Sequence, residues 1–265
     1  MQIFTDDGLV LKAGVTGEAD MILHVLTRSH GIIRTFAKGA RGAKSRLHAV
    51  STPFSFADFT FSEKNGVYNV REAQIKTIFF RLREDMALLS LGQYFCEVLL
   101  RSLPEDTESD EYLRLTLNTL HFLCEGTLPP LLLKAIFELR IASVSGYMPQ
   151  LVACDTCGEY RTEEMYFDAL SGKLYCSACG RGMPIPKVPY SVIETMRNVV
   201  FAPFGKIFSV SPPPEELPSL NRLTETFLQN SFQINYRLLS FFYAFADDHP
   251  DRVPDAMPKP AGDTK

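Results

Sequence analysis

Four cysteines in two short pairs are the residues of this chain whose types and spacing predict chemistry. Each pair has two residues between its cysteines, and eighteen residues separate the pairs. This spacing is typical of a zinc site, because two facing Cys-x-x-Cys loops supply the tetrahedral thiolate set that zinc prefers. Cysteine would fill every ligand position and leave none for water or substrate, so the expected role is structural. The predicted ligands of one structural zinc ion are Cys154, Cys157, Cys176 and Cys179.

The residues around the cysteines favour a small zinc ribbon over residues 152–182. Gly158 and Gly180 follow the two pairs, and a positive φ at each would let backbone amides turn towards the sulfurs. Two short strands are predicted at residues 161–167 and 172–175. So small a finger buries little apolar surface, and zinc binding is expected to supply much of its folding free energy.

The cysteines admit two other interpretations. Disulfides are one, but the chain opens without the charged and apolar segments of a secretory signal, so the cytoplasm is the expected location. A zinc-dependent base deaminase is the other, and it requires His-x-Glu ahead of Pro-Cys-x-x-Cys. No histidine here is followed two places on by Glu, and neither cysteine pair follows proline. No catalytic residue is predicted, and the chain is not expected to be an enzyme.

The net charge of −4 conceals a difference between two parts of the chain. Residues 1–80 carry ten Lys and Arg against seven Asp and Glu, whereas residues 81–265 carry seventeen against twenty-four. No acidic residue occurs between Asp20 and Asp58, and a stretch of one sign attracts phosphate. The cations of that stretch are Arg28, Arg34, Lys38, Arg41, Lys44 and Arg46.

Five short strands are predicted in the first eighty residues, where apolar and polar residues alternate and glycines mark the turns. Five strands before any helix favour a closed barrel of the oligonucleotide-binding (OB) type. The fourth segment is rich in phenylalanine, and we expect its rings to fill the barrel rather than to stack on bases. The predicted strands span residues 2–15, 19–28, 32–38, 54–62 and 67–75, and the rings are those of Phe54, Phe56, Phe59 and Phe61.

The loop at residues 38–46 is the predicted nucleic-acid contact. It superficially resembles a phosphate-binding P-loop, but that motif needs glycine where this chain has Lys38 and Ala43, so nucleotide hydrolysis is rejected. A glycine-rich basic loop suits a nucleic-acid backbone, which Lys and Arg contact without reading bases. A solvated charged loop is the alternative. The predicted nucleic-acid-binding residues are Arg34, Lys38, Arg41, Lys44 and Arg46.

From residue 81 onward, apolar residues recur at helical spacing. Helices are predicted at about residues 85–103, 112–124, 129–146, 191–201 and 217–245. Cys96 and Cys124 fall within them and are expected to be buried apolar groups. The expected fold class is therefore α+β, with an OB-type barrel followed by a mostly α-helical domain that carries the inserted ribbon. The predicted domains are the barrel (1–80), the helical domain (81–246) and a disordered tail (247–265) rich in proline and acid.

These features resemble the bacterial RecO family from residue 1 to about residue 245. The resemblance implies a recombination mediator that binds single- and double-stranded DNA, anneals complementary strands and works with RecR. It also implies help in loading the recombinase onto DNA coated with single-strand-binding protein. The family's basic barrel loop carries over to the loop cations named above. The residues that carry the resemblance are Ala37-Lys38-Gly39-Ala40-Arg41, Phe137-Glu138-Leu139-Arg140, Gly146-Tyr147-Met148-Pro149 and the cysteine pairs.

The resemblance further implies a partner for the helical domain, the acidic C-terminal peptide of single-strand-binding protein. Lys134 and Arg140 are the cations nearest to that region, without a residue-by-residue match. A nucleoid-associated location in the cytoplasm would follow. The alternative function is a protein-interaction module of a repair or transcription complex, in which the ribbon and the acidic helices dock a partner and the barrel is a scaffold. DNA binding by residues 1–80 alone would distinguish the two.

Overall fold

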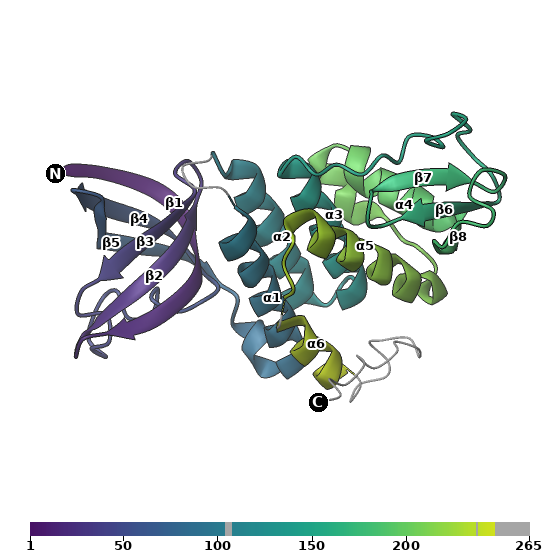
Figure 1. The fold of residues 1–265 in the computed structure, drawn as a ribbon. Coiled ribbons are helices and arrows are strands. Elements are labelled where there is room, and N and C mark those ends of the chain that lie inside the picture. Colours follow the sequence, from purple (N-terminus) through teal and green to yellow (C-terminus); the bar gives the residue numbers. More distant parts are fainter. Residues whose placement is uncertain (104–107, 237, 247–265) are drawn as a thin grey trace, which may run out of the picture. The chain divides into compact units, whose positions relative to one another are not determined.

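The computed structural model describes residues 1–103, 108–236 and 238–246 (Figure 1). Backbone contacts group the chain into two units, which are Met1–Thr127 with Tyr236–Phe242, and Leu128–Asn235 with the residues from Tyr243 onward. The first unit contains the strands of the N-terminal part together with two helices, and the second contains the cysteine pairs. The domain boundaries at residues 80 and 246 stay predictions, and the tail 247–265 lies outside the described residues.

The first unit begins with a closed five-stranded barrel, which Figure 1 shows in purple and blue. Its strands follow the order β1-β2-β3-β5-β4, with β3 and β5 parallel and the other neighbours antiparallel. Five strands in this closed order are the arrangement of an OB fold, so the predicted barrel is confirmed. The strands are β1 (Gln2–Thr16), β2 (Asp20–Thr27), β3 (Ile32–Ala37), β4 (Ser55–Lys64) and β5 (Val67–Ile78).

The phenylalanines of the fourth segment do not all fill the barrel. Phe59 and Phe61 are fully buried in its core, as predicted. Phe54 precedes β4 with a positive φ of 67°, and its ring lies beside Gly92 of the following helix rather than in the barrel core. Phe56 is half-buried, with the Lys76 ammonium 5.4 Å from its ring centroid. Phe54 is only 1% exposed, so it is a core residue as predicted, although it lies outside the barrel cluster. The prediction was wrong for Phe56, because the two-residue period of β4 turns only alternate side chains inward.

Two helices complete the first unit after a short 3₁₀ turn (Phe80–Glu84). They are α1 (Met86–Ser102) and α2 (Asp110–Glu125), and both pack against β1. Asp85 begins α1 as a side-chain cap, because its carboxylate accepts the amides of Ala87 and Leu88 at 2.9 and 3.1 Å. Cys96 and Cys124 are buried in the two helices, as predicted. Burial raises the pKa of Cys96 to about 12, so this thiol stays protonated.

The second unit contains α3 (Pro130–Val144), α4 (Tyr190–Phe201) and α5 (Leu217–Phe232), with 3₁₀ turns at Phe204–Ser209 and Pro214–Glu216. The single helix predicted over 217–245 is wrong. Gln233 adopts a positive φ of 54° and ends α5, and a separate helix α6 follows at Leu238–Ala246. Throughout the described residues, no helix is both long enough and apolar enough to span a membrane.

The cysteine ribbon is a three-stranded antiparallel sheet in the order β7-β6-β8. Strands β6 (Glu164–Asp168) and β7 (Lys173–Cys176) correspond to the two that were predicted. The third, β8 (Lys187–Pro189), was not expected, because prolines at 184, 186 and 189 favour a connector. An edge strand tolerates proline, since one side of it makes no ladder hydrogen bonds.

Candidate metal centre and nucleic-acid interface

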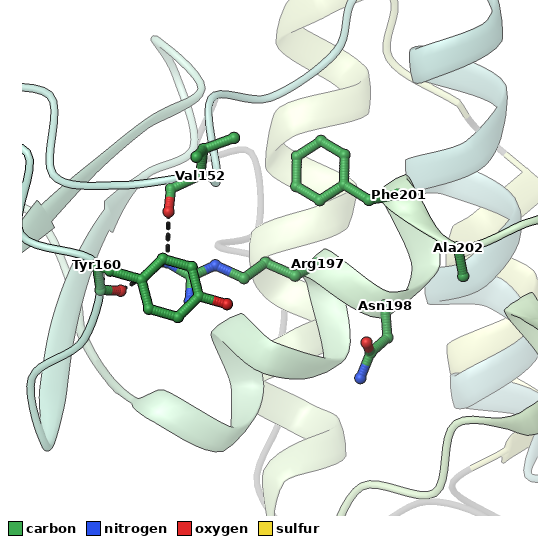
Figure 2. Close-up of a pocket in the computed structure, with 6 residues that line it drawn as sticks. All are labelled: Val152, Tyr160, Arg197, Asn198, Phe201 and Ala202. Carbon is green, nitrogen blue, oxygen red and sulfur yellow. Dashed lines mark hydrogen bonds between the residues drawn. The ribbon is translucent and has the colours of Figure 1, made fainter.

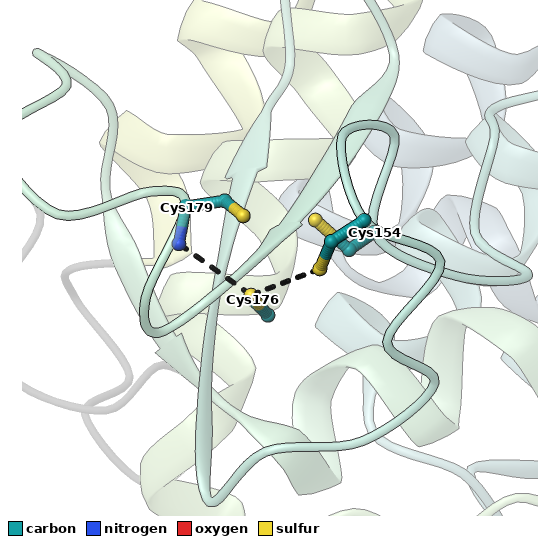
Figure 3. Close-up of side chains that lie close together, drawn as sticks. Cys154, Cys176 and Cys179 are labelled. Atoms are coloured by element: carbon teal, nitrogen blue, oxygen red, sulfur yellow. Dashed lines mark hydrogen bonds between the residues drawn. The ribbon is translucent and has the colours of Figure 1, made fainter.

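The four predicted cysteine ligands meet at one end of the ribbon (Figure 3). Their sulfur atoms all lie within 4.8 Å of one another, and the sulfurs of Cys157 and Cys176 are 3.7 Å apart. Four sulfurs bound tetrahedrally at about 2.3 Å from zinc would be about 3.8 Å apart. The cluster is therefore close in size to a tetrahedral four-thiolate site, and soft thiolate donors fit zinc.

Each cysteine pair lies on a tight turn in which the glycine amide donates to the carbonyl of the first cysteine at 2.9 Å. Gly158 has the predicted positive φ, 77°. Gly180 does not, and the prediction there was wrong. A side chain at Gly180 is excluded for another reason, because a Cβ atom would lie 2.4 Å from the ring of Tyr166 on β6. The second turn therefore needs glycine for space rather than for its dihedral angles.

Backbone amides favour the thiolate form of Cys154. Burial raises the pKa of Cys154, but hydrogen bonds with the backbone at Cys157, Cys176 and Thr156 outweigh it and lower the pKa to about 6. Cys179 also donates its amide to the sulfur of Cys176 at 3.5 Å. Metals bind the thiolate and not the thiol, so the backbone prepares Cys154 to bind a cation.

Arg197 of α4 attaches the ribbon to the helices of the second unit (Figure 2). Its side chain is only 6% exposed, and its guanidinium donates to the carbonyls of Leu151 at 2.6 Å, Val152 at 3.1 Å and Tyr160 at 2.8 Å. It also donates to the hydroxyl of Tyr190 at 3.1 Å and lies 4.1 Å from the centroid of the Tyr160 ring. These carbonyls flank the first cysteine pair, so Arg197 fixes the position of that half of the metal site.

Arg197 was not among the residues predicted from the sequence. A signal was present, because Arg197 lies four residues after Ile193 and three before Val200, on the apolar face of its helix. A cation on such a face needs a buried partner. Beside it, Phe201, Asn198 and Ala202 line a shallow pocket against the ribbon (Figure 2).

The basic loop between β3 and β4 presents most of its predicted cations to solvent. Lys38, Lys44 and Arg46 are exposed, and no ion pair involves them within the described part of the chain. Arg41 is exposed as well, but its guanidinium donates to the carbonyl of Glu18 at 2.6 Å and its amide to Ala19 at 3.1 Å. Arg41 therefore ties the loop to the β1–β2 turn.

Arg34 lies on the barrel wall and not on the loop. It is exposed at the middle of β3, between the buried residues Ile33 and Thr35, so its side chain points out of the barrel. The structure thus divides the five predicted DNA contacts into four on the loop and one on a strand.

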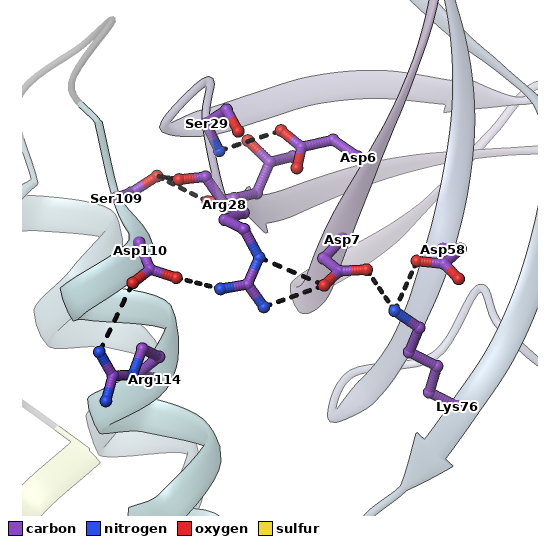
Figure 4. Close-up of polar contacts among 10 residues, drawn as sticks. Asp6, Asp7, Arg28, Ser29, Asp58, Lys76, Ser109, Asp110 and Arg114 are labelled. Atoms are coloured by element: carbon purple, nitrogen blue, oxygen red, sulfur yellow. Dashed lines mark hydrogen bonds and ion pairs between the residues drawn. The ribbon is translucent and has the colours of Figure 1, made fainter.

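Arg28, which the sequence placed among the unopposed cations, has acidic partners in the first unit (Figure 4). It pairs with Asp7 at 2.9 Å and with Asp110 at the start of α2, and Lys76 also pairs with Asp7. Burial raises the pKa of Asp7, but its hydrogen bonds, including those from Lys76 and Arg28, outweigh it and hold that pKa well below its usual range. Arg28 therefore connects the β2–β3 turn to α2. It is not free for DNA.

Lys134, one of the two cations considered for a peptide contact, is also used internally. Its side chain is fully buried and pairs with Glu138 at 2.9 Å and with Glu225 at 3.1 Å. Arg140 donates to the carbonyl of Val200 at 2.8 Å. Lys134 is consequently out of reach of an external acidic peptide.

The described geometry defines a class of protein in which an OB-type barrel with an exposed basic loop precedes helices that carry a four-cysteine ribbon. Two family profiles match almost the whole chain, one described as "Recombination protein O N terminal" over residues 1–79 and one as "Recombination protein O C terminal" over residues 83–239. The chain belongs to the recombination protein O (RecO) family.

Individual relatives agree with this assignment. The chain is 26% identical over 242 residues to the DNA repair protein RecO of Acetivibrio thermocellus, covering 91% of this chain and 96% of the relative. It is 30% identical over 242 residues to the protein of that name from Thermoanaerobacter sp. (strain X514), covering 91% and 97%. The corresponding protein of Alkaliphilus metalliredigens is 33% identical over 173 residues, which are 65% of this chain and 70% of the relative.

Proposed function

We propose that this chain is a DNA repair mediator that binds single- and double-stranded DNA and anneals complementary strands without catalytic turnover. The observation that carries the proposal is a loop on an OB-type barrel whose cations Lys38, Lys44 and Arg46 are exposed and lack ion-pair partners among the described residues. Membership of a family whose relatives are called DNA repair proteins supports it.

The mechanism follows from charge. Two DNA strands repel each other, and a basic surface that neutralises both raises their local concentration while base pairing selects the partner. Contacts from Lys and Arg to phosphate carry no sequence information, so the expected binding is tolerant of sequence and weakened by salt. In this role the protein acts with RecR and helps load the recombinase onto DNA covered by single-strand-binding protein, whose C-terminal peptide is a further partner. A nucleoid-associated location follows.

We propose one zinc ion as the only cofactor, held by Cys154, Cys157, Cys176 and Cys179. Zinc would supply structural cross-linking of the two turns and no reaction chemistry, because all four donors are cysteine. The chain itself orients the ribbon, because Arg197 holds the first cysteine turn against α4.

Annealing of two complementary strands coated with their own single-strand-binding protein tests the proposal. Wild type should accelerate annealing, and the variant Lys38→Ala/Lys44→Ala/Arg46→Ala should lose most of that acceleration. Arg41 is left in place because its removal would also release the loop from the β1–β2 turn. A triple substitution of exposed cations in the second unit, Lys206→Ala/Arg181→Ala/Arg222→Ala, is the matched control.

The outcomes separate the possible readings. If wild type does not anneal the strands, the mediator function is refuted and the protein-interaction module becomes the better account. If the loop variant and the control both anneal as well as wild type, the function stands and the loop is not the DNA contact.

A further inference from the structure

The four cysteines of the candidate metal site differ in their exposure to solvent. Cys157 is exposed and Cys179 is half-exposed, whereas Cys154 and Cys176 are only 4% and 3% exposed. All the residues from 155 to 161, on both sides of Cys157, are exposed as well. A small solute can therefore reach the side chain of Cys157 from solvent, while the ribbon shields Cys176.

The exposed cysteine and a buried one are already in contact. The sulfurs of Cys157, on the first turn, and Cys176, on the second, are 3.7 Å apart. A disulfide would draw them together to about 2 Å. Because the two residues belong to different turns, such a bond would join the same two segments of chain that a bound metal ion joins.

Contacts that involve no sulfur hold the first cysteine turn against β7. The amide of Asp155 donates to the carbonyl of Leu174 at 2.7 Å, and the Asp155 carboxylate pairs with Lys173 at 2.9 Å. Cys176 is the last residue of that strand. These contacts therefore keep Cys157 close to Cys176 while the cysteines are oxidised.

We propose that Cys157 is the site at which a peroxide oxidises this protein, and that Cys176 then joins it in a disulfide between the first turn and β7. The inference rests on the proposed zinc site and adds a second, metal-free state of that site. Zinc is released in this state, because Cys154 and Cys179 alone cannot complete a four-thiolate set. The ribbon keeps its fold, because the disulfide replaces the cross-link that zinc supplied.

The peroxide supplies the oxidising equivalents for both steps. The Cys157 thiolate attacks one peroxide oxygen, the O–O bond breaks, and a sulfenic acid and hydroxide are formed. The Cys176 thiolate then attacks the sulfenic sulfur, so that the S–S bond forms and the S–O bond breaks with loss of a second hydroxide. The two thiolates together lose two electrons, and the peroxide takes up two protons from solvent to become two waters.

Treatment of the zinc-loaded full chain with hydrogen peroxide tests the proposal. A colorimetric zinc indicator follows release of the ion, and peptide mass spectrometry after alkylation of free thiols maps the disulfide. Wild type should release its zinc and yield the linked peptides of Cys157 and Cys176, and dithiothreitol with added zinc should reverse both changes. Cys157→Ser should slow the release by about tenfold or more, because the remaining cysteines are less accessible to the oxidant. Cys124→Ser, a buried cysteine of α2, is the matched control and should behave as wild type.

Limited proteolysis separates the oxidised state from simple loss of metal, and this readout needs no substitution. Reduced wild type that a chelator has stripped of zinc should be cut within residues 152–182, whereas peroxide-treated, equally zinc-free wild type should resist cutting there. Equal cutting of the two forms would refute the proposed fold of the oxidised ribbon.

The remaining outcomes separate this inference from the zinc site on which it rests. A disulfide within one pair, sulfonic acids without a disulfide, or zinc that stays bound under peroxide would refute the inference and leave the zinc site standing. If the chain binds no zinc even when zinc is supplied, the proposed cofactor and the inference are both refuted.

Discussion

Substitution of Arg197 by methionine should release the first cysteine turn from α4. Methionine retains much of the apolar stem but removes all the donors, and it leaves the carbonyls of Leu151 and Tyr160 without their partner. Hydrogen bonds from a charged group are worth about 1.5–3 kcal/mol each when buried and less where water can replace them. The bonds to Leu151 and to the Tyr190 hydroxyl are the buried ones. The expected loss is therefore about 3–4 kcal/mol.

Hydrogen exchange of the amides in residues 151–160 is the assay that isolates this effect. A loss of about 3 kcal/mol in local stability corresponds to opening that is about 100-fold more frequent. Arg197→Lys keeps the charge without the planar fork and should lose about half as much free energy. Arg222→Met, at an exposed position of α5, is the matched control. Exchange in Arg197→Met that matches this control would refute the view that Arg197 holds the ribbon in place.

Three further perturbations have outcomes that the structure determines. The depressed pKa of Asp7 means that its ion pairs stabilise the fold above the unfolded pKa, about 3.9, and that this contribution is lost as pH falls through the folded value. Urea midpoints of wild type should therefore decline below about pH 4 more steeply than those of Asp7→Asn. Removal of metal by a chelator should make residues 152–182 susceptible to limited proteolysis before the barrel is cut, because the four thiolates then lose the ion that joins them. A first cleavage within β1–β5 would contradict this. Lys134→Met should lower the free energy of unfolding by about 3–5 kcal/mol, since it leaves Glu138 buried without its cation, and a urea titration showing less than about 1 kcal/mol would contradict it.

Local sequence patterns were sufficient to predict a structural element wherever one short stretch of chain contained all the residues that define it. The spacing of the cysteine pairs predicted that their four sulfurs would meet, because zinc sites of this spacing join two Cys-x-x-Cys turns. Alternation and turn residues predicted the five barrel strands, since a strand that buries one face must repeat every two residues. The chain also contained no local sign that one predicted helix would end at Gln233, where a positive φ divides it into two.

Pairings between distant residues were decided only by the tertiary structure. Arg28 belongs to the stretch of sequence that contains no acidic residue, yet folding places Asp7 and Asp110 beside it. Arg197 and Lys134 likewise acquired partners from other elements. Residue types and spacing determine which groups can bind a metal or a phosphate. Which charged side chains remain free to bind a ligand depends on long-range contacts. Two residues can form an ion pair although they are far apart in the sequence, so no sequence periodicity reveals the pair.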